Sequence, residues 1–166
     1  AAKEIGEKTG ADVMGIAADI TSIDGIEALV EKVVQRFDHI DILLNGAGLN
    51  IRKSVLEFEE ADWDKVQDVQ LKYVFFMCQA VARHMVEKKI KGKIINIASL
   101  TSQLGLPNMV AYCAAKGAIV QLTKALANEL APYGINANAI GPGYYETAMT
   151  KPIFEDTAYA QKLLSR

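Results

Sequence analysis

Short apolar runs alternate with longer helical patterns along the whole 166-residue chain. Two parallel strands need a crossover of a dozen or more residues, usually a helix, so this alternation predicts a parallel sheet. The runs are almost continuously apolar, which is typical of strands covered by helices on both faces. We therefore predict an α/β fold with strands over about 12–18, 40–44, 93–98 and 135–140, and helices over about 21–37, 60–88, 109–132 and from 152 onward.

The composition indicates one folded domain spanning residues 1–166, since 51% of the residues are hydrophobic and 23% are charged. The net charge of −2 is spread along the chain and gives no electrostatic case for nucleic acid as a partner. No apolar run approaches the roughly 20 residues that cross a bilayer, so no membrane partner is expected. Residues 1–8 resemble the second half of a helix, and we expect the chain to begin inside a domain.

The two cysteines, Cys78 and Cys113, lie within helical patterns and lack the spacing of metal ligands. The two histidines, His39 and His84, have no companion ligands nearby. We therefore expect no metal site, and we expect both cysteines to be free thiols in a reducing cytoplasm.

Unusual residues gather where the predicted strands end. Open parallel sheets bind ligands beyond the carboxyl ends of their strands, and glycine there lets a backbone approach a planar ligand closely. Turn formation alone would also explain glycine and proline, but four strand ends share the feature. No glycine-rich phosphate loop joins the first predicted strand to its helix. The strand-end residues are Asp19; Asn45, Gly46, Ala47 and Gly48; Ser99; and Pro142 and Gly143.

Three residues have the chemistry of a proton-transfer site. Tyr112 and Lys116 are four residues apart in a helical pattern, which places them on one helix face. An ammonium beside a phenol favours the phenolate, so we expect the pKa of Tyr112 to be lowered towards neutrality. Ser99 follows the third apolar run, where its hydroxyl can hold the oxygen of the same substrate.

These segments resemble the motifs of the short-chain dehydrogenase/reductase family. Residues 45–48 resemble its Asn-Asn-Ala-Gly element, 96–99 its strand with the catalytic serine, and 112–116 its Tyr-x-x-x-Lys signature. Residues 138–143 resemble the element beside the nicotinamide. The resemblance covers the whole chain and implies a doubly wound, Rossmann-like parallel sheet, of which this chain would supply strands three to six. It also implies a glycine-rich segment upstream and a further C-terminal end.

The resemblance implies hydride transfer between a secondary alcohol or ketone and NAD or NADP, without distinguishing the two cofactors. Tyr112 would be the general acid/base, Lys116 would lower its pKa and bind the nicotinamide ribose, and Ser99 would orient the substrate oxygen. The residues implied to contact the cofactor are Asp19, Ile20, Asn45, Gly46, Ala47, Gly48, Tyr112, Lys116, Pro142, Gly143, Tyr145 and Thr147.

Two positions depart from the family motifs. Gly46 replaces the second asparagine of the Asn-Asn-Ala-Gly element, and Gln70 stands where the family has an asparagine that helps hold a proton-relay water. Glutamine keeps the amide but places it one methylene further out, so we expect slower catalysis. The alternative is a non-catalytic family member that serves as a binding or assembly module.

Residues 48–52, 99–105 and 142–151 resemble gluconate 5-dehydrogenases most, and deoxygluconate and other sugar dehydrogenases next. The implied substrate is a small sugar acid or polyol. Arg52 follows the second predicted strand, and a guanidinium there can bind a carboxylate through two hydrogen bonds. The alternative interpretations are a solvated loop arginine beside Lys53 and, for the enzyme, a 3-oxoacyl carrier-protein reductase.

The helical segments 60–88 and 109–132 carry apolar residues on more than one side, as in 74–77. One side meets the sheet, which leaves apolar surface for a partner. In the family these helices form the principal dimer interface, so the resemblance implies a homo-oligomer, either a dimer or a tetramer. The alternative is that loops or other segments cover this surface.

Overall fold

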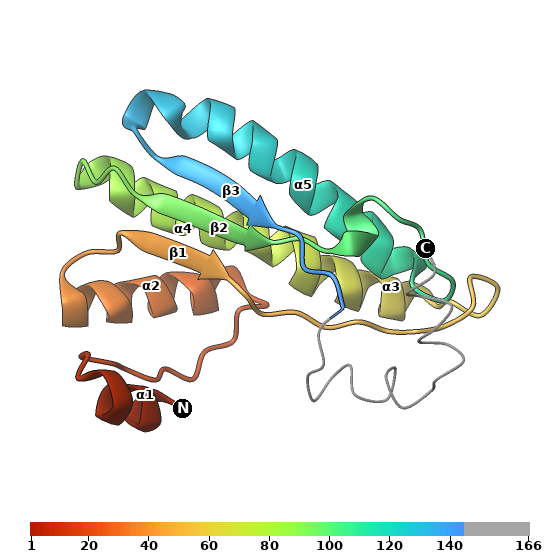
Figure 1. The fold of residues 1–166 in the computed structure, drawn as a ribbon, viewed down its shortest axis with the longest axis horizontal. Helices are drawn as coiled ribbons and strands as arrows, with labels where there is room; N and C mark the ends of the chain where they lie inside the picture. The colour runs from red at the N-terminus through yellow and green to blue at the C-terminus, as the bar shows by residue number, and fades with distance from the viewer. Residues whose placement is uncertain (145–166) are drawn as a thin grey trace.

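The computed structural model describes residues 1–144, which form a three-stranded parallel sheet packed against helices (Figure 1). The strands are β1 (Ile42–Asn45), β2 (Lys93–Ile97) and β3 (Asn136–Ile140), in the order β1-β2-β3. Their register places Leu43 beside Ile94, and Ile94 beside Ala137. The parallel sheet and three of the predicted strands are therefore confirmed.

The helices follow the predicted alternation, with two short turns added where strands and helices meet. The helix predicted from residue 152 onward lies outside the described residues. The elements are α1 (Ala2–Thr9), α2 (Ile23–Phe37), α3 (Glu60–Gln67), the π-turn η1 (Asp68–Lys72), α4 (Tyr73–Glu87), the 3₁₀ turn η2 (Leu100–Ser102), α5 (Val110–Leu130) and the 3₁₀ turn η3 (Ala131–Tyr133). No helix in residues 1–144 combines the length and hydrophobicity needed to span a membrane.

The start of α2 shows how the sequence sets a helix boundary. Ser22 is the N-cap residue, and its Oγ accepts a 3.0 Å hydrogen bond from the backbone N–H of Gly25. A Cβ atom at position 25 would lie 2.0 Å from the carbonyl oxygen of Asp19, so only glycine fits this turn. This cap fixes where the chain leaves Asp19 and enters α2.

The hydrophobic core lies between one face of the sheet and helices α2, α4 and α5. Side chains from all three helices are buried there beside the middle strand, and each contributes about 1.5–3 kcal/mol when fully buried. The largest members are Ile26 on α2, Met77, Val81 and Met85 on α4, Leu126 and Leu130 on α5, and Ile94 on β2.

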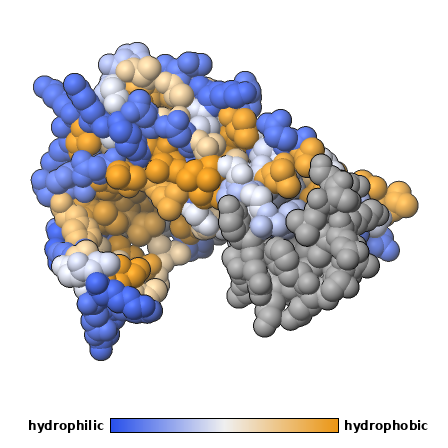
Figure 2. Space-filling view, in the orientation of Figure 1, coloured by the Kyte–Doolittle hydropathy of each residue, from blue (hydrophilic) through white to orange (hydrophobic). Residues whose placement is uncertain are grey.

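The second face of the sheet differs from the prediction of two covered faces. Ile42 and Leu44 of β1 are 62% and 57% exposed, and Ile140 of β3 is 52% exposed. Figure 2 shows hydrophobic residues gathered on this side of the molecule. Among the described elements, the helices that pack on the sheet all belong to the core side. The strands were predicted to be buried on both faces because they are apolar, and burial follows only where a helix covers them.

The strand predicted over residues 12–18 is wrong, because residues 10–19 form no strand. A strand requires a hydrogen-bonded neighbour, and the only ladders in residues 1–144 join β1, β2 and β3. The segment is instead held beside α2 by an ion pair between Arg36 and Asp12.

The helix predicted over 60–88 is confirmed in its span, and the structure adds a π-helical turn, η1, between α3 and α4. Single π-turns within α-helices occur frequently at functional sites. Here the turn contains Gln70, one of the two positions that depart from the family motifs. Periodicity of apolar residues does not reveal such a turn, since the pattern on either side is helical.

Candidate active site

The predicted catalytic residues meet at the carboxyl end of β2. Ser99 follows the strand and caps the turn η2, while Tyr112 and Lys116 lie in the first two turns of α5. The Tyr112 and Ser99 side chains share a hydrogen bond, and Lys116 Nζ lies 5.6 Å from the centre of the Tyr112 ring. The structure therefore brings together the three residues that the sequence predicts.

The expected lowering of the Tyr112 pKa is wrong for this structure. Burial raises the pKa of Tyr112 above its ordinary value of 10.0, and the hydrogen bond with Ser99 lowers it only in part. The ammonium of Lys116 is directed elsewhere and does not contribute to the shift. The i, i+4 spacing placed both residues on one face, but it did not determine which atom the lysine would contact.

Lys116 is buried at the junction between α5 and the sheet. Its Nζ donates a 2.6 Å hydrogen bond to the carbonyl oxygen of Ile97, the last residue of β2. Burial lowers the pKa of Lys116 from 10.5 to about 8, because a desolvated ammonium loses hydration. The lysine is therefore close to its neutral form at mildly alkaline pH.

The turn η2 contains a residue that sequence reasoning missed. Ser99 Oγ accepts a 3.1 Å hydrogen bond from the N–H of Thr101, and Ser102 Oγ accepts a 3.2 Å bond from the N–H of Ser99. The Ser102 hydroxyl then donates to the carbonyl oxygen of Lys116 at 2.8 Å. The Ser-x-x-Ser spacing, which has the form of a capping box, is the signal that would have found Ser102.

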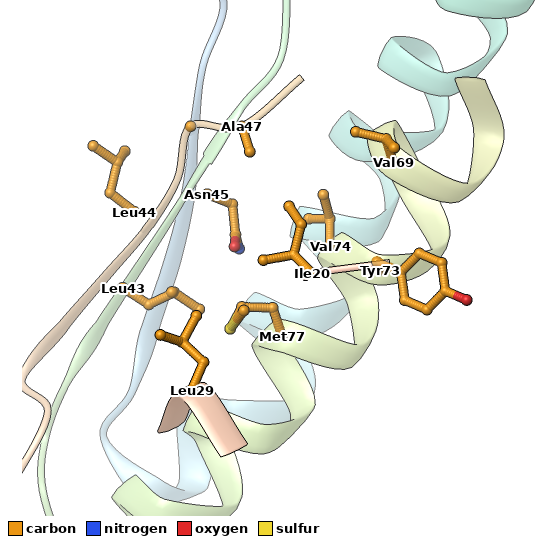
Figure 3. Close-up of a pocket in the computed structure, with 11 residues that line it drawn as sticks. Ile20, Leu29, Leu43, Leu44, Asn45, Ala47, Val69, Tyr73, Val74 and Met77 are labelled. Atoms are coloured by element: carbon orange, nitrogen blue, oxygen red, sulfur yellow. The ribbon is translucent and has the colours of Figure 1, made fainter. Parts of the chain in front are cut away.

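Part of the predicted nucleotide-binding set lines one cavity of about 220 Å³ beside the end of β1 (Figure 3). Its wall contains Ile20, Asn45, Gly46 and Ala47, together with aliphatic residues of α2 and α4. No atom lies within 4 Å of a Cβ built at Gly46, so this position faces open space. The cavity thus brings Ile20, which follows the irregular segment 10–19, close to residues 45–47 at the end of β1.

Asp19 and Gly48 do not line this cavity. The Asp19 carboxylate accepts hydrogen bonds from the N–H and hydroxyl of Thr21, and these bonds lower the pKa of Asp19. A Cβ atom at Gly48 would lie 2.9 Å from Nε2 of Gln70. Gly48 therefore makes room for the side chain of Gln70, and its role in cofactor binding stays a prediction.

Gln70 joins the π-turn to the loop after β1. Its side chain is 2% exposed, and its Nε2 donates to the carbonyl oxygen of Leu49. Gln67, at the end of α3, donates from Nε2 to the carbonyl oxygen of Ala111 at 2.9 Å. The two glutamines therefore contact the segments on both sides of the candidate site, and sequence reasoning missed Gln67.

Asn45 belongs to a buried chain of polar groups beneath the strand ends. Its Nδ2 donates to Oδ1 of Asn96 at 2.9 Å, and Nδ2 of Asn96 donates to Oγ1 of Thr123 at 3.0 Å. The Thr123 hydroxyl in turn donates to the carbonyl oxygen of Ile119 at 2.7 Å. The chain links β1, β2 and α5, so the Asn45 amide nitrogen points into the protein interior.

The adjacent basic residues Arg52 and Lys53, in the loop after β1, have different surroundings. Lys53 forms an ion pair with Asp62 of α3, and this hydrogen bond raises the pKa of Lys53. Arg52 is exposed and has no hydrogen bond or ion pair with another residue of the 1–144 segment. The lysine thus anchors the loop, while the adjacent guanidinium is exposed.

The last predicted cofactor residues follow β3. The carbonyl oxygen of Pro142 accepts a 2.9 Å hydrogen bond from the N–H of Leu100, which brings this segment beside η2. Gly143 has open space around its Cβ position. Tyr145 and Thr147 lie outside the described residues. In residues 1–144, no cluster of three His, Cys, Asp or Glu side chains is suited to a metal ion.

The chain is similar to known proteins over most of its length. The family model described as short chain dehydrogenase matches residues 1–158. This chain belongs to the short chain dehydrogenase family. Membership confirms the Rossmann-like α/β class that the motifs implied.

Individual short chain dehydrogenases match at high identity. The 2-dehydro-3-deoxy-D-gluconate 5-dehydrogenase of Escherichia coli K12 is 44% identical over 157 residues, covering 95% of this chain and 62% of that protein. The 5-keto-D-gluconate 5-reductase of the same strain is 42% identical over 156 residues, covering 93% and 61%. A crystal structure of a gluconate 5-dehydrogenase from Burkholderia cenocepacia J2315 with NADP and tartrate superposes with a TM-score of 0.90 at 37% identity, covering 96% of this chain and 62% of that one. The chain therefore spans about 62% of the length of the first of these relatives.

Proposed function

We propose that this chain carries the catalytic part of an NAD(P)-dependent oxidoreductase that acts on a secondary alcohol or ketone of a sugar acid or polyol. The observation that carries the proposal is the cluster of Ser99, Tyr112 and Lys116 at the carboxyl end of β2. A hydrogen-bonded serine and tyrosine can hold one substrate oxygen between them and exchange a proton with it. The nearby lysine supplies a cation on the same helix.

In this proposal Tyr112 is the general acid/base, and Ser99 orients the substrate oxygen. Because Ser99 Oγ accepts from the N–H of Thr101, the serine proton is directed away from the turn and remains available as a donor. The raised pKa of Tyr112 keeps the phenol protonated, which suits donation to a carbonyl oxygen. For the reverse direction, Lys116 must leave the Ile97 carbonyl and approach the phenol.

The residues around the strand ends fit a nicotinamide dinucleotide. Gly46 faces open space, and Ile20, Asn45 and Ala47 line the adjoining cavity of about 220 Å³. We assign these four residues, with Lys116, to cofactor binding, and we propose the same role for Asp19, Gly48, Pro142, Gly143, Tyr145 and Thr147 on the family motif. When bound, the cofactor supplies or accepts the hydride.

A carboxylated substrate is supported by Arg52. This exposed guanidinium has no partner within residues 1–144, whereas Lys53 beside it is held by Asp62. The Burkholderia relative was crystallised with tartrate, a hydroxylated dicarboxylic acid. We therefore propose a sugar acid rather than an uncharged polyol as the preferred substrate.

We also propose a cytoplasmic homo-oligomer. The outward faces of α4 and α5 enclose a cavity of about 470 Å³ lined by Phe75, Val86, Leu126 and Tyr133 among others. The lining also includes the charged residues Arg83, Glu87 and Glu129, and a hollow with apolar and charged side chains between two helices suits a second copy of the same helix pair. Cys78 and Cys113 are both free thiols, which is consistent with a reducing compartment.

The proposal is tested by assaying the complete protein with NAD and with NADP, on gluconate-type sugar acids, uncharged polyols and a 3-oxoacyl thioester. We expect oxidation of the sugar acids. We expect the rate of this oxidation to fall by at least about 10²-fold in Tyr112→Phe. Preference for the thioester would establish the acyl reductase instead. Absence of turnover on all three classes, despite cofactor binding, would establish a binding or assembly module.

A further inference from the structure

We propose that Ser102 is a positioning residue that holds the two halves of the active site together through its hydroxyl. The inference rests on the proposed oxidoreductase function of the same site. The hydroxyl accepts a hydrogen bond from the N–H of Ser99 at 3.2 Å and donates one to the carbonyl oxygen of Lys116 at 2.8 Å. One side chain thereby joins the turn that carries the serine to the helix that carries the tyrosine and the lysine.

The directions of these bonds make the role specific. Ser99 uses its N–H to contact Ser102 and its Oγ to accept from the N–H of Thr101. The backbone N–H and the side-chain oxygen of Ser99 are therefore both held by residues of η2. Its hydroxyl proton can then be donated to Tyr112 or to a substrate. Without the Ser102 hydroxyl, the Ser99 N–H loses its partner in the turn and the rotamer of the serine is less constrained.

A second contact between the same two segments explains why Ser102 is needed. Lys116 Nζ binds the carbonyl oxygen of Ile97, so the lysine side chain also ties α5 to the end of β2. In the proposed reaction the ammonium leaves this carbonyl for Tyr112 or a nucleotide, and the side-chain contact would then be lost. The Ser102 bond uses the lysine backbone instead, and it persists when the lysine side chain moves. Ser102 thus preserves the Ser99–Tyr112 distance in the working state.

The test compares three variants of the complete protein. Ser102→Ala removes both bonds, and Ser102→Thr keeps a hydroxyl. Thr9→Ala is the matched control, because Thr9 Oγ1 also donates to a backbone carbonyl, that of Ile5, on helix α1. For Ser102→Ala we expect kcat to fall roughly tenfold to a hundredfold while KM for the cofactor stays within about twofold. Ser102→Thr should recover most of kcat, and Thr9→Ala should match the parent protein.

A readout without turnover separates this inference from the proposed function. The ¹³Cζ resonance of Tyr112, assigned with Tyr112→Phe, is titrated in cofactor-free protein. The bond with Ser99 lowers the pKa of Tyr112, so Ser102→Ala should raise that pKa further and Ser102→Thr should restore it. If the parent protein turns over no substrate but this shift appears, the proposed function fails and the positioning role stands. An unchanged Tyr112 titration, or a loss of thermal stability in Ser102→Ala with kcat intact, overturns the positioning role.

Discussion

Lys116 Nζ donates a 2.6 Å hydrogen bond to the carbonyl oxygen of Ile97 and not to the hydroxyl of Tyr112. The site is therefore held in a state in which the lysine ammonium contacts the end of β2. Burial lowers the pKa of this lysine to about 8, so its charge opposes folding at neutral pH.

Lys116→Met should make the protein inactive but more stable at pH 7, because methionine fills the site without a buried charge. In the parent protein the unfolded chain binds more protons than the folded one between about pH 8 and 10.5. Parent stability therefore rises with pH across this window, and the advantage of the methionine variant shrinks there. Urea unfolding of both proteins from pH 7 to 10.5 measures this. A difference that stays constant with pH would contradict a depressed lysine pKa.

Gly48→Ala should destabilise the protein by about 1–2 kcal/mol, because the new methyl group displaces the buried amide of Gln70 from Leu49. The cost should shrink in a Gln70→Ala background, where the amide is absent. Gly46→Ala is the matched control, because its Cβ meets open space. Denaturant unfolding of this double-mutant cycle gives the coupling energy. Equal costs in both backgrounds would show that the two residues do not interact.

Asn96→Ala should cost about 3 kcal/mol, since it leaves the Asn45 amide and the Thr123 hydroxyl with one hydrogen bond fewer in a buried site. Asn138→Ala, at an exposed position of the neighbouring strand, should change stability by less than about 0.5 kcal/mol. Thermal and urea unfolding measure both variants. Similar losses at the two positions would mean that the buried polar chain contributes little.

Arg52→Ala should raise KM for a sugar acid about tenfold or more, because a bidentate carboxylate contact is removed. KM for an uncharged polyol should remain nearly unchanged. Lys53→Ala serves as a control of equal charge change, since Lys53 is paired with Asp62 and does not face a ligand in this proposal. Steady-state kinetics on both substrate classes decide the matter, and an equal effect of Arg52→Ala on both would exclude the carboxylate contact.

Periodicity and motif spacing predicted most of the fold. Strands β1, β2 and β3, helix α2, and the shared helix face of Tyr112 and Lys116 follow local rules of periodicity and i, i+4 spacing, and the place of Ser99 beside them follows from the end of a parallel strand. The unpaired segment 10–19 and the exposed face of β1 could not be predicted in this way. Both depend on whether a neighbour is present, and the apolar pattern of a strand does not specify its neighbour.

The sequence predicted which residues form the candidate site better than it predicted which atoms they contact. Spacing indicated that Lys116 and Tyr112 share a helix face, but the Ile97 carbonyl competes for the ammonium and lies in a strand far along the chain. Gly48 was interpreted as room for a ligand, and the structure adds that its missing side chain also makes room for the Gln70 amide twenty-two residues away. Contacts between distant segments decide these roles, and no local pattern encodes them.

The π-turn between α3 and α4 has a geometric consequence for the whole site. Each residue of an α-helix turns the side-chain direction by about 100°. The wider π-turn at 68–72 changes the direction in which the following side chains point. The apolar stripe of α4 is therefore not a direct continuation of the face that α3 presents. Gln67 and Gln70 can then face α5 and the loop after β1, while Met77, Val81 and Met85 still face the sheet. One helical rod thus serves two surfaces of different orientation, and the phase shift between them is located at the active site.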